Sequence, residues 1–393
     1  MPGKAVMVVL DGLGVGALPD ASEYGDLGAN TVGNVATVVK DLRIPNLARL
    51  GLGRVAPIGA NSGGAVIDGC YGKMAERSAG KDSTTGHWEL AGVITERPFP
   101  LYPRGFPESL LERFLKVTGC GGYLGNKAAS GTEIIKELGD EHVRTGYPIV
   151  YTSGDSVFQI AAHEGVISLD RLYEICARTR NEVAIGEHAV GRVIARPFIG
   201  TSGRYTRTPN RKDYATEPPV PTLLDLLQRE GVETVGVGKI DDLFCGRGLD
   251  RKFHTRSNTE GIQLTLELAQ GPKKGFVMTN LVDFDMLYGH RQDPVGMARA
   301  LEEFDRAVPE LIEGLHEGDM LLITADHGND PTDSSTDHSR EYVPILCYRK
   351  SGKKGVNLGT RSSYADAGKT VAEFFSLRGI GELAGNSFLD LIV

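Results

Sequence analysis

The segment Thr324–Asp330 (TADHGND) places a carboxylate and an imidazole directly after an apolar run, Met320–Ile323, and a second imidazole, His338, follows shortly after. Polar side chains at the exit of a buried strand lie where parallel sheets carry their ligands, at the carboxyl ends of the strands. Aspartate and histidine in that place could bind a divalent metal ion. An Asp-His pair alone is weak support, because such a pair also caps turns.

Two further apolar runs end in the same way. Lys4–Leu10 is followed by Asp11, and Phe276–Val282 is followed by Asp283 and by further Asp and His residues. The combined candidate ligands are Asp11, Asp285, His290, Asp326, His327 and His338. Oxygen and imidazole donors without a thiolate suit a pair of Mn²⁺ or Zn²⁺ ions with open positions for substrate. The alternative is that the aspartates cap helices and the histidines lie in ordinary loops.

A loop of small residues, Gly80–Leu90 (GKDSTTGHWEL), carries hydroxyl groups into a predicted helix start, with Asp82 or Ser83 as the N-cap. Free backbone N–H groups at such a start would hold a phosphate. Serine is a poor nucleophile at neutral pH, and a metal ion or His87 could activate it. The alternative is a serine that only caps a turn.

The order of these residues resembles that of the alkaline phosphatase superfamily, and the chain is similar to phosphopentomutases over nearly its whole length. The passages that carry the likeness are GKDSTTGHWEL (80–90), GNKAASGTEI (125–134), YTSGDS (151–156), VGRVIARPF (190–198), TRTPNR (206–211), NLVDFDMLYGHR (280–291) and TADHGNDPTDSSTDHSREYVP (324–344). Familiar members of the family carry threonine as the nucleophile after Lys-Asp, where this chain has Ser83. Thr84 and Thr85 therefore stay open as alternatives.

The resemblance implies how the site residues divide. One metal group would be Asp11, Asp326 and His327, with Ser83 facing it, and the other would be Asp285, His290 and His338. The resemblance also implies manganese as the metal. The substrate-facing residues that it implies are Ser153, Asp155, Arg192, Arg207 and Lys239.

The activity that the resemblance implies is the interconversion of ribose 1-phosphate, or deoxyribose 1-phosphate, with the 5-phosphate in nucleoside salvage. We expect an isomerase that works through a phosphoserine and a pentose 1,5-bisphosphate, with a sugar bisphosphate as activator. A phosphoglycerate mutase-like enzyme or a phosphomonoesterase would use the same two-metal core. A non-catalytic metal or sugar-phosphate binding protein would require a broken nucleophile or ligand set, and here every position holds a competent residue.

Proline-rich stretches near Arg97 and at Pro218–Pro221 predict the borders of an insertion. We expect a core domain in two parts, 1–97 and 219–393, and a smaller α/β cap domain at 98–218. The insertion carries Arg196 and Arg211 besides the arginines named above, and guanidinium groups match phosphate, although solvated surface arginines are the alternative. In the outer parts, strand-like runs alternate with helical patterns. This alternation predicts a doubly wound, mostly parallel α/β sheet with helices on both faces.

The composition bounds the remaining possibilities. The chain has 393 residues and a net charge of −8, and we expect neither a membrane-spanning segment nor a secretion signal. This charge disfavours nucleic acid and anionic membranes as partners. The partners that the resemblance implies are small-molecule pentose phosphates. The 5 cysteines form no CxxC pair, which is typical of reduced thiols in a cytoplasmic protein. We expect a monomer or a weak homo-oligomer.

Overall fold

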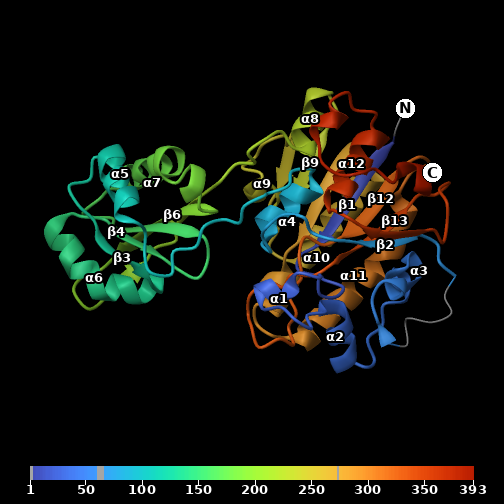
Figure 1. Ribbon diagram of the computed structural model, residues 1–393, viewed down its shortest axis with the longest axis horizontal. Helices are drawn as coiled ribbons and strands as arrows, with labels where there is room; N and C mark the ends of the chain where they lie inside the picture. The colour runs from blue at the N-terminus through green and yellow to red at the C-terminus, as the bar shows by residue number, and fades with distance from the viewer. Residues whose placement is uncertain (1–2, 60–65, 272–273) are drawn as a thin grey trace. The chain divides into compact units, whose positions relative to one another are not determined.

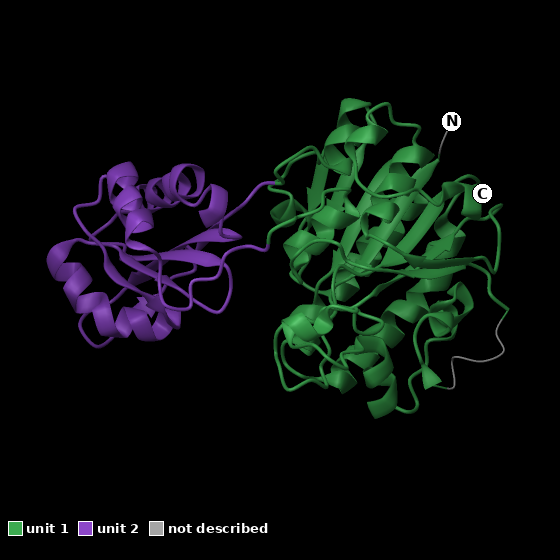
Figure 2. Cartoon of the chain, in the orientation of Figure 1, with its two compact units in different colours: residues 1–97, 218–393 green, residues 98–217 purple. Residues whose placement is uncertain are grey.

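The computed structural model describes residues 3–59, 66–271 and 274–393. The chain divides into two compact units, which Figure 2 shows in different colours. The core unit comprises Met1–Arg97 and Pro218–Val393, and the insert unit comprises Pro98–Glu217.

The core unit is built on an 8-stranded sheet in the order β10-β9-β11-β1-β12-β13-β2-β14. Its strands are β1 (Lys4–Leu10), β2 (Cys70–Met74), β9 (Thr234–Val237), β10 (Arg251–Phe253), β11 (Gly275–Leu281), β12 (Met320–Thr324), β13 (Val343–Tyr348) and β14 (Asn357–Arg361). Every neighbouring pair is parallel except the two pairs that β13 makes, with β12 and with β2. The predicted mostly parallel α/β sheet is confirmed.

Helices cover the sheet on both sides, as Figure 1 shows with α8 and α12 on one side and α10 and α11 on the other. The helices of the core unit are α1 (Ala21–Tyr24), α2 (Thr31–Val38), α3 (Pro45–Leu50), α4 (Ser83–Leu90), α8 (Leu223–Arg229), α9 (Ile240–Leu243), α10 (Asn258–Gln270), α11 (Pro294–Gly314), α12 (Ala365–Phe374) and α13 (Leu389–Ile392). Short turns of 3-10 or π geometry are η1 (Leu52–Arg54), η5 (Phe284–Gly289) and η6 (Ile380–Glu382). Because both faces are covered, the central strands β1, β11 and β12 are buried along their whole length.

The register of the central strands brings their carboxyl ends level. Leu10 of β1 pairs with Leu281 of β11, and Val9 pairs with Thr324 of β12. The residues that follow these strands therefore meet at one edge of the sheet.

Helix α11 contains Pro309, which has no N–H to donate to the carbonyl of Asp305 one turn earlier. The sequence predicts a kink or a break there, yet α11 runs as one helix from Pro294 to Gly314. The side-chain amide of Asn46 donates to the Asp305 carbonyl at 3.0 Å, so that this carbonyl keeps a partner.

The insert unit has its own 6-stranded sheet, in the order β3-β4-β5-β6-β7 with β8 paired to β6. Its strands are β3 (Leu124–Ala128), β4 (Ile149–Thr152), β5 (Val157–His163), β6 (Arg192–Ile199), β7 (Thr206–Arg207) and β8 (Lys212–Ala215), and its helices are α5 (Glu108–Thr118), α6 (Gly131–Thr145), α7 (Leu169–Arg178), η3 (Thr179–Val183) and η4 (Gly186–His188). One apolar cluster joins α5 and α7 to the sheet, with Phe114 and Phe158 among its members, and another joins α6 to it, around Ile134 and Phe198. The insert unit therefore contains its own hydrophobic core.

Candidate functional site

The sheet edge beyond β1, β11 and β12 gathers the predicted metal ligands. Ligand atoms of Asp11, Asp326 and His327 lie within 4.8 Å of one another, and so do those of Asp285, His327 and His338. His327 Nε2 is 3.3 Å from Asp11 Oδ1 and 3.4 Å from Asp326 Oδ2. Both aspartates are fully buried. Donors from separate strands therefore converge on a small buried region.

His290 completes the cluster on its more exposed side. Its Nε2 lies 3.2 Å from Asp285 Oδ2, while His338 Nε2 lies 3.4 Å from the other oxygen, Asp285 Oδ1. The His327 and His338 rings have their centroids 4.0 Å apart. The six predicted ligands thus form one continuous group. His327 belongs to both groups of three whose ligand atoms lie close together, the group with Asp11 and Asp326 and the group with Asp285 and His338. The sequence alone assigned it to a single set.

The charges in the cluster shift the pKa values of its members in opposite directions. Burial would raise the pKa of Asp285, but the charge on His338 and the close contacts of its carboxylate with the His290 and His338 rings hold the pKa well below its usual range. Burial would lower the pKa of His327, but Asp326 first, and Asp11 and Asp285 with it, raise it well above the ordinary value.

The residues fit a divalent cation. Among the described residues, Asp11 Oδ1, Asp326 Oδ2 and His338 Nε2 are buried without a hydrogen-bond partner. Buried polar atoms are normally satisfied, and a cation between these donors would satisfy them. Carboxylate and imidazole donors are those that Mn²⁺ and Zn²⁺ accept.

Two asparagines orient the carboxylates, and the sequence did not single them out. Asn280 Nδ2 donates to Asp11 Oδ2 at 2.9 Å, and Asn329 Nδ2 donates to Asp285 Oδ1 at 2.6 Å. Both are fully buried. The available signal was an amide near the end of the apolar run that forms β11, and a second amide directly after the Asp-His-Gly sequence.

Ser83 is the first residue of α4 and lies beside the ligand cluster. Its Oγ is 3.1 Å from His327 Nε2. The N-cap is Asp82, whose side chain accepts from the backbone N–H groups of Thr84 and Thr85 at 3.0 and 3.1 Å. Thr85 is buried, and its hydroxyl donates to the Asp82 carbonyl at 3.0 Å, so it supports the helix start. Of the candidate nucleophiles Ser83, Thr84 and Thr85, Ser83 is the one whose hydroxyl lies close to a predicted metal ligand, His327.

His87 lies behind the cluster and does not contact the Ser83 hydroxyl. It is fully buried, and its Nδ1 is 2.9 Å from the Ser83 carbonyl oxygen and 3.0 Å from Asp326 Oδ2. Its position suits the orientation of Asp326 better than the activation of a nucleophile.

The predicted substrate-facing residues divide between the two units. Lys239 belongs to the core unit, and its Nζ is 3.8 Å from Asp11 Oδ2. The other four belong to the insert unit, and are Ser153, Asp155, Arg192 and Arg207.

Within the insert unit, these side chains are accessible. Ser153 Oγ accepts from the Asp155 N–H at 3.4 Å in the turn after β4. Arg192 and Arg207, on β6 and β7, are exposed, and Arg192 Nη1 is 3.8 Å from the carboxylate of Asp213.

The other two arginines that the sequence analysis named in the insertion, Arg196 and Arg211, bind neighbouring side chains. Arg211 makes a two-pronged ion pair with Asp213, and Arg196 Nε donates to Gln159 Oε1 at 3.0 Å.

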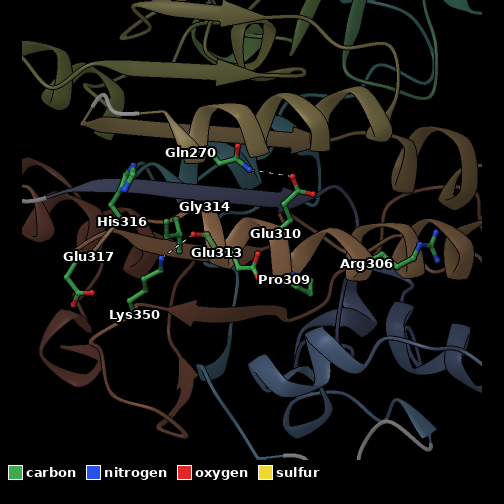
Figure 3. Close-up of a pocket in the computed structure, with 10 residues that line it drawn as sticks. Gln270, Arg306, Pro309, Glu310, Glu313, Gly314, His316, Glu317 and Lys350 are labelled. Carbon is green, nitrogen blue, oxygen red and sulfur yellow. Dashed lines mark hydrogen bonds between the residues drawn. The ribbon is translucent and has the colours of Figure 1, made fainter.

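A surface depression elsewhere in the core unit contains none of the predicted site residues. It is lined by residues around the end of α11, including Glu310, Glu313 and Lys350 (Figure 3). This end of α11 leads into the amino end of β12, whereas the ligand cluster follows the carboxyl end.

Among the described residues, we find no helix with the length and apolar character needed to cross a bilayer.

Comparison with known proteins identifies relatives along the whole chain. A family model described as the Metalloenzyme superfamily matches residues 3–378. The phosphopentomutase of Acetivibrio thermocellus is 56% identical over 390 residues, which cover 99% of this chain and 100% of the relative. The phosphopentomutase of Clostridium novyi is 52% identical over 393 residues, with 100% of both chains covered. Among solved structures, a phosphoglycerate mutase of Leishmania mexicana has a TM-score of 0.45 at 13% identity, and the match covers 100% of this chain and 98% of that one.

Proposed function

Because this chain belongs to the phosphopentomutase family, and is therefore a metal-dependent isomerase of pentose phosphates, we propose that Ser83 carries the transferred phosphoryl group. The observation that supports this assignment is the position of Ser83 Oγ, 3.1 Å from His327 Nε2 at the edge of the buried ligand cluster. The substrates are ribose 1-phosphate or deoxyribose 1-phosphate and the corresponding 5-phosphates.

We assign the metal ligands to two sites. Asp11, Asp326 and His327 hold one divalent ion, and Asp285, His290 and His338 hold the other. Manganese is the ion that the likeness to the family implies, and carboxylate oxygens and imidazole nitrogens are donors that it accepts. Such ions, when bound by these residues, would neutralise oxygens of the transferring phosphoryl group and lower the pKa of the serine hydroxyl.

The reaction passes through a phosphoserine and a bisphosphate. Phosphorylated Ser83 gives its phosphoryl group to the free hydroxyl of a bound pentose monophosphate, and that hydroxyl loses its proton as its oxygen bonds to phosphorus. The sugar 1,5-bisphosphate turns, and Ser83 Oγ then attacks the other phosphorus. The sugar oxygen that leaves takes up a proton, so the cycle is balanced. A trace of sugar bisphosphate restores enzyme that has lost its phosphoryl group.

The insert unit carries four of the five residues that we assign to substrate binding. Arg192 and Arg207 present exposed guanidinium groups, which bind phosphate oxygens in pairs. Ser153 and Asp155 suit hydrogen bonds to the sugar hydroxyls. Lys239, on the core unit beside Asp11, adds a positive charge at the metal cluster.

The test compares Ser83→Ala with Thr84→Val. Ser83→Ala should lose both mutase turnover and the phosphopeptide that contains residue 83, while Thr84→Val keeps both. Turnover is measured as ribose 5-phosphate formed from ribose 1-phosphate. Near-normal turnover in Ser83→Ala would refute the assignment. Release of free phosphate, or turnover of 3-phosphoglycerate in place of the pentose, would favour the other activities that this core can support.

A further inference from the structure

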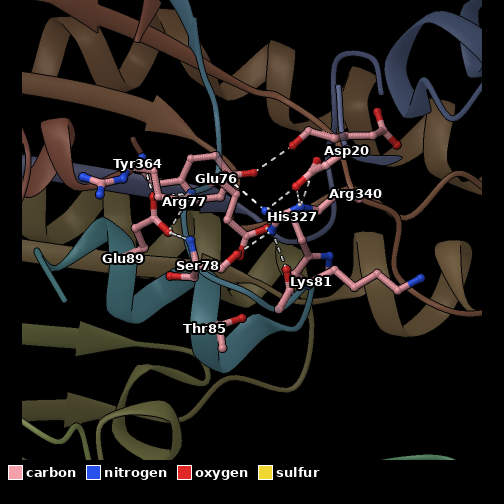
Figure 4. Close-up of polar contacts among 12 residues, drawn as sticks. Asp20, Glu76, Arg77, Ser78, Lys81, Thr85, Glu89, His327, Arg340 and Tyr364 are labelled. Carbon is pink, nitrogen blue, oxygen red and sulfur yellow. Dashed lines mark hydrogen bonds and ion pairs between the residues drawn. The ribbon is translucent and has the colours of Figure 1, made fainter. Parts of the chain in front are cut away.

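Arg340 lies in the segment between His338 and β13, and its guanidinium is almost completely buried, with the side chain 4% exposed. Nη1 is 2.8 Å from Glu76 Oε2, 2.7 Å from the Ser78 carbonyl oxygen and 2.6 Å from the Gly80 carbonyl oxygen. Nη2 and Nε donate to the carboxylate of Asp20, at 3.0 Å and 3.2 Å. Figure 4 shows Arg340 with its partners Asp20, Glu76 and Ser78. Arg340 therefore binds the chain that leads directly to Ser83.

The same segment holds this loop at a second point. The Arg340 backbone N–H donates to Asp26 Oδ2 at 2.8 Å, and the Asp26 carboxylate accepts from Lys81 Nζ at 3.1 Å. Lys81 Nζ is also 3.4 Å from Asp337 Oδ2. Asp337 and Arg340 flank His338 in sequence, so the segment that carries a predicted metal ligand also grips the loop that carries Ser83.

Glu89 holds the loop from its other side. Its carboxylate accepts from the backbone N–H groups of Arg77 and Ser78 at 2.6 to 3.1 Å, and from the Ser363 hydroxyl at 2.7 Å. Glu89 belongs to α4, the helix that Ser83 begins. Residues 76–80 are thus fixed between α4 and Arg340.

We propose that Arg340 is a positioning residue that sets the location of Ser83 relative to the metal ligands. It touches no reacting atom and acts through the Ser78 and Gly80 carbonyls. A guanidinium can bind two carbonyls and two carboxylates at once because its donors point outward in one plane, whereas a lysine ammonium cannot span them. A displacement of about 1 Å in a reacting group costs roughly 100-fold in rate, so loosening of this loop should appear in kcat. The inference rests on the proposed role of Ser83.

The test uses Arg340→Lys and the double variant Arg340→Met/Glu76→Gln. Lysine keeps a positive charge beside Glu76 but cannot bind the Ser78 and Gly80 carbonyls at the same time. The double variant removes the guanidinium together with the buried Glu76 carboxylate, so that no buried carboxylate is left unpaired, while the Asp20 carboxylate, whose side chain is 38% exposed, can be solvated. Arg361→Lys is the matched control, because Arg361 pairs with the buried Asp366 and a main-chain carbonyl, outside the Ser83 loop.

For both Arg340 variants we expect kcat to fall by about 100-fold, KM for the pentose phosphate to stay within about twofold, and metal content to stay at the wild-type level. Amide hydrogen exchange should rise in the peptide covering residues 77–83. Arg361→Lys should change neither kcat nor exchange in that peptide. A support of the fold alone would lower the melting temperature without this division between kcat and KM.

Wild-type kcat in folded, fully metallated Arg340→Lys would overturn the inference. So would a loss of activity explained entirely by lost metal, since Arg340 would then support the metal ligands and not Ser83. If the wild-type enzyme did not phosphorylate Ser83, the proposed function would fail. Exchange in residues 77–83 would still decide whether Arg340 holds the loop.

Discussion

Gly86→Ala tests how closely α4 packs against the loop that carries the metal ligands. Gly86 lies inside α4, and a Cβ added there would be 2.0 Å from the carbonyl oxygen of Asp326 and 2.8 Å from its carbonyl carbon. Carbon–oxygen contacts in proteins lie at roughly 3.3 Å or more. The helix and the Asp326 loop would therefore have to separate by about 1.3 Å.

Two opposing effects set the magnitude. Alanine in place of glycine inside a helix stabilises the folded state by about 0.5–1 kcal/mol. Overpacking of a buried contact costs about 1–3 kcal/mol, and here the obstacle is backbone that cannot rotate away. We expect a net loss of about 1–2 kcal/mol in the free energy of unfolding. Because Ser83 begins α4, the displacement should also lower kcat by roughly 100-fold, or about 2.7 kcal/mol in the activation barrier.

The assay combines thermal denaturation with mutase kinetics at saturating metal. The control is Gly381→Ala in η6, where an added Cβ meets nothing within 4 Å. We expect Gly381→Ala to keep wild-type kcat. A Gly86→Ala enzyme with unchanged melting temperature and unchanged kcat would refute the close packing of α4 on Asp326.

The other predictions concern metal affinity. Asn280→Leu would remove the amide that donates to Asp11 Oδ2 at 2.9 Å without adding a charge. Loss of such a supporting bond should weaken metal binding by about 10–100-fold in a titration of metal-free protein, and unchanged affinity would argue against an orienting role for Asn280. The pKa of His327 is raised well above its usual value, so a metal ion must displace a proton from this side chain. The apparent affinity of the protein for the metal should therefore rise as the pH increases from 6 to 8 and fall on acidification. A metal affinity independent of pH would contradict this coupling.

The sequence by itself predicted the sheet edge, because burial on both faces makes the central strands continuously apolar and their polar exits easy to recognise. Asp11, Asp326 and His327 directly follow or closely follow such strands, and parallel strands must present these ends together. The likeness to a family then gave the chemistry, and the proline-rich borders led us to predict a core in two parts. These features are local in sequence, or follow from the period of the secondary structure.

Tertiary structure alone decided which side chains share a neighbour. The His327 ring lies near ligand atoms of both groups, and the His87 ring contacts Asp326 and the Ser83 carbonyl instead of the Ser83 hydroxyl. Both facts depend on ring orientations that no spacing in the sequence specifies. Arg340 resembled any charged loop residue in the sequence, because its partner carbonyls in Ser78 and Gly80 lie 262 and 260 positions away. Contacts over such separations form only when the whole sheet is assembled. Because every residue has a main-chain carbonyl, the residue types at positions 78 and 80 do not indicate that these carbonyls bind an arginine.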